Sequence, residues 1–416
     1  MFLEIMQDWA GWLLMLFNFS IVLMWKSVRS DTKVIHAIWL CIFFHSTVAF
    51  LNAYLGGIIG TEMDARSFHS AGVNVDASPR PEWGFGAPGA TYGNFLGLFY
   101  YVFGASRLLG NVLSVFAFTL SCIVLVRLVS LLDLGRFRVG IILLFGLLPS
   151  AVIFRSVTLR ETWQTLFFLL FVYWAIRMWK RPSILKFLFM LMSTYCMAML
   201  HTGLKEYAMF LIPISVYWVI FGRKIGVRWE RQVRFFFAGL LAACVIMLIQ
   251  NMGGDMNVGR VLASAENFRT EALTIHGRTT YGVVLDTSSV LGLVKTIPMI
   301  FVQYMFAPFP WQVEYVKDIY ALLESVLRFV LLFFAVYSWR RSSGEVRSCY
   351  NFLLIIFLGM EFMWALGTIN WGTATRHHVP GYSVIVLLGA PGLILFMRRL
   401  HFELFGRRED NTMLPK

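Results

Sequence analysis

Long apolar stretches recur along this chain, and they constrain its fold more than any other feature. A membrane-spanning helix needs about 20 mostly apolar residues, and stretches of this kind return from Trp9 to Arg399. Hydrophobic residues make up 58% of the 416 residues and charged residues only 14%, whereas a soluble domain has roughly 25% charged residues. The sequence therefore predicts an all-α, polytopic integral membrane protein and excludes a soluble one.

Apolar stretches separated by polar turns predict about 11 transmembrane helices in a single domain, 1–416. We see no internal repeat and no appended soluble domain. The predicted spans are 9–25, 34–59, 108–132, 139–154, 162–178, 184–200, 207–221, 235–250, 320–339, 350–367 and 380–397.

Two further apolar stretches, 95–104 and 291–309, are predicted to be re-entrant or interfacial segments. Residues that interrupt a helix break both of them: Gly104, Pro298, Pro308 and Pro310. The two long loops, 60–94 and 251–289, are expected to form a cap outside the membrane.

The distribution of basic residues predicts the orientation. With the C-terminus in the cytoplasm, 23 of the 36 lysines and arginines lie on the inner side, as the positive-inside preference requires. Glu4 and Asp8 precede the first span in place of a basic segment, so this span is expected to be retained and the N-terminus to lie outside. The net charge of +13 lies beside apolar runs, which indicates membrane lipids as partners and no nucleic acid.

Basic residues also stand at the predicted outer ends of several spans. Each is disfavoured there by the helix dipole, by ~0.3–1 kcal/mol, and by the positive-inside preference. A shared phosphate or pyrophosphate explains this placement, because helix N-termini bind such anions. The alternative is that each side chain snorkels to lipid phosphates or pairs with a local acid. The residues are Arg107, Arg160, Lys205, Lys317 and Arg376.

Three polar turns are expected to face one another across an outward cavity. The turn at 155–161 holds Arg155 and Arg160 together with Glu161, and 201–207 contains Lys205. Charges near the membrane core are usually functional, although Glu161 can equally serve to neutralise an arginine.

The third turn, 370–380, carries Arg376 and His377, which we interpret as a clamp for a leaving group. Pro380 is expected in the first turn of the last span. His377 and His378 are adjacent, so their side chains diverge on a helix and do not predict a shared metal site. A polar loop capped by proline is the alternative.

The first long loop provides the predicted catalytic residues, Asp64 and His69. Asp64 follows a span end closely, which suits a general base at the membrane surface. Glu62 and Asp64 also permit a divalent cation without specifying one. An ordinary solvated acidic loop is the alternative, and the metal remains open.

The stiff aromatic run 307–314 supplies the predicted sugar contacts, Trp311 and Glu314. Trp311 can stack on a sugar ring or belong to the aromatic belt at the lipid headgroups. Arg269, in the second long loop, is placed to close over a substrate.

These motifs together resemble bacterial GT-C glycosyltransferases and the related O-antigen or exopolysaccharide polymerases. The resemblance rests on four elements: Asp64–Ala65 with Phe68–His69, Pro149–Ser150 with Leu159–Arg160–Glu161, Ala307–Pro308–Phe309–Pro310–Trp311, and Gly372–Thr373 with Arg376–His377. It implies a GT-C-like fold in which Asp64 activates an acceptor hydroxyl. Arg160, Lys205 and Arg376 would then stabilise the departing lipid phosphate.

The activity implied is transfer of a sugar or oligosaccharide from a polyprenyl-(di)phosphate donor, on the outer face of the bacterial inner membrane. The expected partners are this lipid-linked sugar, membrane lipids and other polysaccharide-assembly proteins, with no cofactor. A lipid-linked oligosaccharide flippase is the alternative, as is a non-catalytic subunit of an assembly complex. The hypothesis of a transport function is supported by four charged residues inside or beside spans: Arg127, Glu324, Arg328 and Glu361.

Overall fold

The computed structural model describes residues 8–56, 62–77, 90–221, 266–267, 269–271, 279–281 and 283–405, and these ranges are almost entirely helical. Six of the described helices are long and apolar enough to cross a membrane, which confirms an all-helical chain with the character of a membrane protein. They are Thr32–Tyr54, Arg107–Leu131, Thr202–Ile220, Asp318–Arg341, Gly344–Gly367 and Trp371–Glu403. The predicted span 235–250 lies outside the described residues.

The first part of the chain packs around one central helix, α7, which contacts α2, α4 and α10. Buried residues lie on every side of α7, as expected of a helix inside a bundle. In chain order the elements are α2 (Trp9–Ile21), η1 (Val22–Met24), α3 (Lys26–Arg29), α4 (Thr32–Tyr54), α5 (Glu62–Asp76), α6 (Ala90–Phe103) and α7 (Arg107–Leu131).

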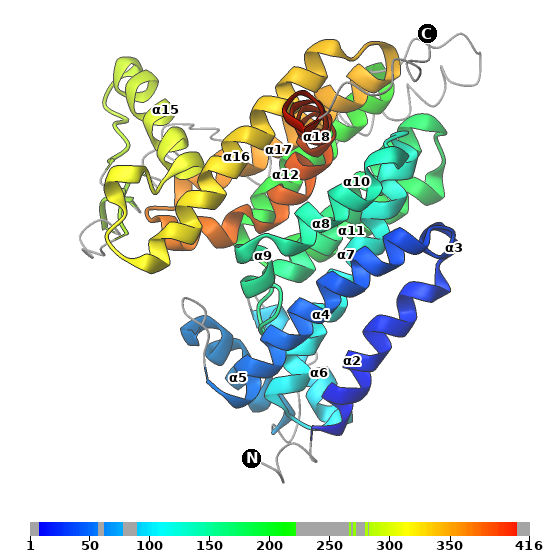
Figure 1. The fold of residues 1–416 in the computed structure, drawn as a ribbon. Helices are drawn as coiled ribbons and strands as arrows, with labels where there is room; N and C mark the ends of the chain where they lie inside the picture. The colour runs from blue at the N-terminus through cyan, green and yellow to red at the C-terminus, as the bar shows by residue number, and fades with distance from the viewer. Residues whose placement is uncertain are drawn as a thin grey trace.

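The rest of the chain forms a second group of helices beside the first, in the upper part of Figure 1, where α18 lies along α16 and α17. The elements are η2 (Gly135–Phe137), α8 (Arg138–Leu147), α9 (Pro149–Phe154), α10 (Glu161–Lys180), α11 (Ile184–Ala198), α12 (Thr202–Phe221), α15 (Val290–Phe306), η3 (Pro310–Gln312), α16 (Val316–Arg341), α17 (Gly344–Gly367) and α18 (Trp371–Phe405).

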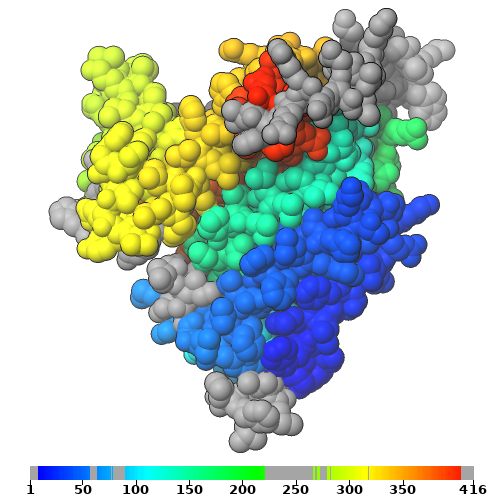
Figure 2. All heavy atoms as spheres, in the orientation of Figure 1, coloured from blue at the N-terminus to red at the C-terminus, as the bar shows by residue number. Residues whose placement is uncertain are grey.

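The two groups meet through α8, α9 and α10. Helices α8 and α9 contact α4 on one side, while α18 contacts α8, α9 and α10 on the other. Figure 2 shows the same order on the surface, from blue α4 through green α8 and α9 to yellow α16. The α9–α10 connection, which carries the turn at 155–161, therefore lies between the two groups.

The predicted span 139–154 is two helices, so the expectation of one continuous segment was wrong. Helix α8 ends at Leu147, Leu148 is extended, and Pro149 begins α9. Proline has no N–H to donate and favours the first turn of a helix, which explains the break. The stretch 291–309 shows the opposite error: it was expected to be broken at Pro298, but α15 continues through Pro298 as far as Phe306.

The turn at 370–380 and the first long loop are also more helical than expected. Helix α18 begins at Trp371, because the Asn370 side chain accepts a hydrogen bond from the Thr373 N–H at 2.7 Å and caps the helix there. Pro380 therefore lies inside α18 and does not start it. Asp64 likewise lies in α5.

Candidate functional site

Arg376 of α18 joins two acidic residues from distant parts of the chain. One guanidinium nitrogen donates to Asp64 Oδ2 on α5, and the other donates to Glu161 Oε1 at the start of α10, at 2.6 Å. The Glu161 side chain is 4% exposed and the Arg376 side chain 14%, whereas Asp64 is 54% exposed. The three residues form a buried ion pair that opens to solvent at Asp64, and we call them the ion-pair cluster.

Arg160 adds a second cation beside this cluster. Its guanidinium lies over the Phe68 ring, 5.3 Å from the centroid, and it interacts electrostatically with Glu161, Arg376 and Asp64. Burial lowers the pKa of Arg160, and the nearby carboxylates oppose that shift. Two arginines thus face two carboxylates, so the charges of these four residues balance.

Three rings from neighbouring elements contact one another beside the ion-pair cluster. The His377 ring lies on Trp364 of α17 with 4.0 Å between centroids, and His201, before α12, lies 6.1 Å from His377. His377 Nδ1 and the Thr368 hydroxyl are 2.8 Å apart. His201 Nδ1 accepts a hydrogen bond from the Gly203 N–H at 3.0 Å. This bond requires an unprotonated Nδ1, so the neutral ring fits the site.

The state of His201 predicts a pH-dependent stability. Burial, together with the charge of Arg160, lowers the pKa of His201 from 6.5 to about 4. Between these two pH values His201 is protonated in the unfolded chain and neutral in the folded protein. The free energy of unfolding should therefore fall as the pH drops from 6.5 toward 4. Thermal unfolding in detergent should show a smaller loss in His201→Gln than in the wild type. Equal losses would contradict this assignment.

A small polar hollow lies beside α5, next to the ion-pair cluster. It has a volume of about 30 Å³, enough for a water-sized group, and is partly open. No carboxylate is among the described residues that line it, which are Asn52, Ala65, Arg66, His69, Arg107, Asn111 and Thr158. Burial and the charge of Arg107 lower the pKa of His69, whose Nδ1 lies 2.9 Å from the Tyr100 hydroxyl. The lining is suited to an anion.

Of the predicted site residues, the structure brings Asp64, Arg160, Arg376 and His377 together. His69 lines the adjacent hollow. Arg155 has a different environment: it is fully buried and donates to the backbone carbonyls of Phe145 and Val379, at 2.9 and 3.1 Å. These bonds tie α8 to α18, which is a structural task.

The remaining predicted residues are outside the ion-pair cluster. Lys205 is exposed on the first turn of α12. Trp311 is 78% exposed and stacks on Phe309 with 5.0 Å between centroids. Glu314 is exposed just before α16. Exposed side chains at these positions leave the predicted phosphate and sugar contacts as predictions.

Sequence reasoning did not single out Arg66, His201 or Trp364. Arg66 is two residues from Asp64, and this proximity was a usable signal. Trp364 is one of many aromatic residues within apolar helices, and the local sequence does not predict that it stacks on His377. Arg269 was expected to close over a substrate, but it is buried against the end of α17.

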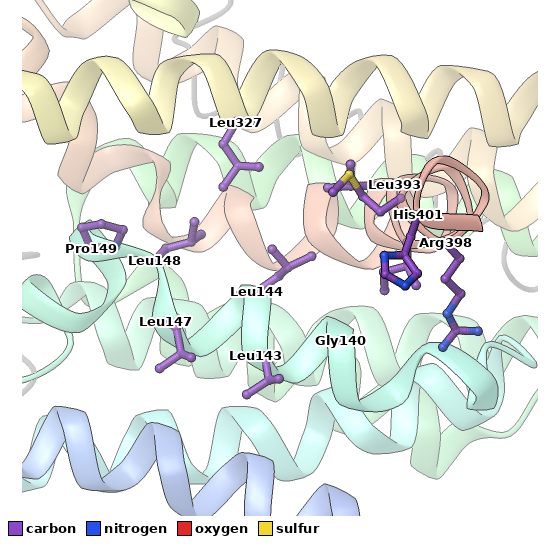
Figure 3. A pocket seen from close by; sticks show the side chains of 12 residues that line it. Gly140, Leu143, Leu144, Leu147, Leu148, Pro149, Leu327, Leu393, Arg398 and His401 are labelled. Carbon is purple, nitrogen blue, oxygen red and sulfur yellow. The ribbon is translucent and has the colours of Figure 1, made fainter. Parts of the chain in front are cut away.

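An apolar groove with a volume of about 740 Å³ lies between α8, α16 and α18. Figure 3 shows aliphatic side chains such as Leu144 and Leu327 along it, with Arg398 and His401 at the end away from Pro149. Such a lining accommodates hydrocarbon, and it offers no acid and base pair for chemistry.

Within the described ranges, no group of three or more His, Cys, Asp or Glu residues is arranged to hold a metal ion. The candidate site is therefore the ion-pair cluster with its flanking rings and the adjacent hollow. Comparison of the chain with protein-family models, with curated proteins and with solved structures found no match.

Proposed function

We propose that this protein is a GT-C-like membrane glycosyltransferase or polymerase with about 11 transmembrane helices. It transfers a sugar or oligosaccharide from a polyprenyl-(di)phosphate donor at the outer face of the bacterial inner membrane. The observation that carries this proposal is the meeting of Asp64, Glu161 and Arg376 at the ends of α5, α10 and α18. These are the ends that the distribution of basic residues places outside.

In this proposal Asp64 is the general base. Its half-exposed carboxylate accepts the proton of the acceptor hydroxyl, while Glu161 is too buried to reach an acceptor. The acceptor oxygen bonds to the anomeric carbon, the bond from that carbon to the phosphate oxygen breaks, and the electron pair leaves with the phosphate. Arg376 donates a hydrogen bond to Asp64 Oδ2 and so orients the base before the reaction.

The leaving phosphate is assigned to the open mouth of the hollow beside α5, because the hollow itself holds only a water-sized group. Arg107 and the N–H of a neutral His69 are donors there, and the 25-residue helix α7 begins at Arg107, so that its N-terminus lies at the hollow. Because Arg376 and Arg160 already face carboxylates, Arg107 at the hollow is the better partner for a phosphate charge.

An apolar cavity near the ion-pair cluster is suited to the lipid part of the donor. It has a volume of about 470 Å³ between α6, α10 and α11. Trp163, two residues after Glu161, and Leu200, next to His201, belong to its lining. A hydrocarbon chain in this cavity would keep its phosphate close to the polar site.

The test is chain growth by the full-length protein in lipid vesicles supplied with a polyprenyl-diphosphate oligosaccharide. We expect growth with the wild type and its loss in Asp64→Asn. Arg399→Ala is the control, since Arg399 pairs with Glu403 on the exposed far part of α18. Growth unaffected by Asp64→Asn, or translocation of the lipid without growth, would refute the proposal.

The hollow predicts a separate effect on donor binding. Arg107→Ala should raise KM for the donor on the order of 10-fold with a smaller change in kcat, because a charge-assisted hydrogen bond to phosphate is worth about 1.5–3 kcal/mol. Initial rates against donor concentration measure this. Arg177→Ala, an exposed arginine near the far end of α10, is the control. An unchanged KM in Arg107→Ala would contradict the assignment of the phosphate to the hollow.

A lipid-linked oligosaccharide transporter is the second candidate. The observation that favours it is the set of charges buried between α16, α17 and α18, namely Glu324, Arg328 and Glu361, each at most 2% exposed. Buried ionisable groups within spans commonly line transport pathways.

A further inference from the structure

Glu361 of α17 and His378 of α18 form a contact deep within the bundle, apart from the ion-pair cluster. Glu361 Oε2 and His378 Nδ1 are 2.5 Å apart, and each residue is 1% exposed. Both helices are among those long and apolar enough to cross a membrane. Neither residue has a part in the proposed transfer.

The hydrogen bonds around His378 fix the number of protons in this pair. His378 Nε2 lies 3.1 Å from the Tyr304 backbone carbonyl oxygen. A carbonyl oxygen only accepts, so Nε2 carries a hydrogen. Nδ1 and Glu361 Oε2 can then form their contact only with a second proton between them. The pair is therefore either an imidazolium beside a carboxylate or a neutral imidazole beside a carboxylic acid.

The surroundings place charge on several sides of the pair. Arg328 of α16 donates to the Tyr382 hydroxyl at 3.1 Å and to the Met305 carbonyl oxygen. On the same helix, Glu324 Oε1 accepts from the Ser150 N–H at 2.5 Å. Other titratable or charged groups that face this network are Tyr207 on α12, Tyr281 before α15, Tyr304 on α15, His377 and Tyr382 on α18, and Arg155 after α9.

Nearby charges can balance the negative charge that remains when the pair loses its shared proton. With Glu324 ionised and the shared proton present, the network of Arg155, Arg328, Glu324 and the pair has one net positive charge. Without the proton, two arginines face two carboxylates and the charges cancel. The carboxylate that proton loss leaves at Glu361 is thus balanced by a buried arginine, whereas a lone buried carboxylate would have no such partner.

The backbone at Gly381 provides room for the carboxyl group. A Cβ atom at Gly381 would collide with Glu361 Oε1, so glycine lets Glu361 lie against α18. Gly381→Ala is accordingly expected to displace Glu361 and lower the melting temperature, while the same change at the uncrowded Gly367 tests for a general helix effect.

We propose that Glu361 and His378 form a proton-binding site within the membrane-spanning bundle, where one proton is bound and released reversibly. Intramembrane acid and histidine groups serve as proton relays in pumps and transporters. His378 is two residues from Arg376, so this site and the ion-pair cluster share one helix. The proposal stands whether the protein transfers sugars or moves them.

The experiment is a pH titration of the full-length protein in lipid, labelled with ¹⁵N-histidine and ¹³C-glutamate, between about pH 5 and pH 8. Solid-state NMR reads the two His378 nitrogens, and infrared spectroscopy reads the carboxylic-acid stretch of Glu361. We expect the shared proton at the acid end and its loss on raising the pH. A through-space correlation between His378 Nδ1 and the Glu361 carboxyl carbon assigns the signals without any variant.

Glu361→Gln keeps the shape and donates a hydrogen bond to Nδ1, so the protein should fold and the titration should disappear. Glu345→Gln, at the exposed start of α17, should leave the titration unchanged. The proposal is overturned if His378 and Glu361 lack the shared proton throughout, if they retain it at every pH, or if the titration persists in Glu361→Gln.

Discussion

Replacing Arg376 by alanine is expected to lower the rate of glycosyl transfer by roughly 10²–10³-fold and to destabilise the protein by about 3–5 kcal/mol. Both effects have the same origin. Arg376 bonds to Asp64 and to Glu161, and the alanine variant leaves the Glu161 carboxylate buried without its partner. The proposed base, Asp64, also loses the group that orients it.

The measurements are chain growth in lipid vesicles and thermal unfolding in detergent. Arg376→Lys keeps the charge but has one ammonium for two carboxylates, so it should recover only part of either property. Adding Glu161→Gln to Arg376→Ala should restore stability without restoring transfer, because it removes the buried charge but not the need to orient Asp64. Arg399→Ala controls for loss of an exposed arginine from α18. Full activity in Arg376→Ala would contradict the proposed mechanism.

The second large effect is expected at Arg269, a fully buried residue. Its guanidinium donates to the carbonyl oxygens of Ala365 and Thr368 at 3.0 and 3.1 Å, and to Val283 at 3.0 Å. The last carbonyls of a helix lack partners within the helix, and a cation is favourable at that end. Arg269 therefore caps α17 and joins it to the segment before α15.

Arg269→Ala should destabilise the protein by roughly 3–5 kcal/mol, since several buried carbonyls lose a charged donor together. Thermal unfolding measures this loss. Arg269→Lys should recover only a part, because an ammonium lacks the planar fork. Arg340→Ala, at the exposed C-terminal end of α16, is the matched control. An Arg269→Ala melting temperature equal to that of Arg340→Ala would show that the cap contributes little.

Local sequence signals predicted most of the helices well. Span 108–132 corresponds to α7, and 162–178 lies within α10. The errors arose at proline and at helix starts. Pro149 divided a span that hydropathy made continuous. Helix α18 includes Pro380 because Asn370, three residues after the predicted span 350–367 ends, caps the helix, so that α18 begins at Trp371, nine residues before the predicted span 380–397. Hydropathy does not register either effect.

The candidate site was predictable in part. The unfavourable placement of Arg160 and Arg376 at predicted outer ends marked them, and the structure places both beside Asp64. The same reasoning treated Arg155 as a phosphate ligand, yet its guanidinium is bonded to the carbonyls of Phe145 and Val379. A cation near an apolar segment can bind a ligand or bond to backbone, and the sequence around it is the same in both cases.

The amino-acid sequence alone determined that this chain is helical and built for a membrane, because in hydrocarbon a segment must satisfy its backbone polar groups internally. The tertiary structure alone decided which charges meet. Asp64 and Arg376 are 312 positions apart, and Glu361 meets His378 only because α17 packs against α18. Pairing of charges depends on distances of a few ångströms between helices, and packing sets those distances.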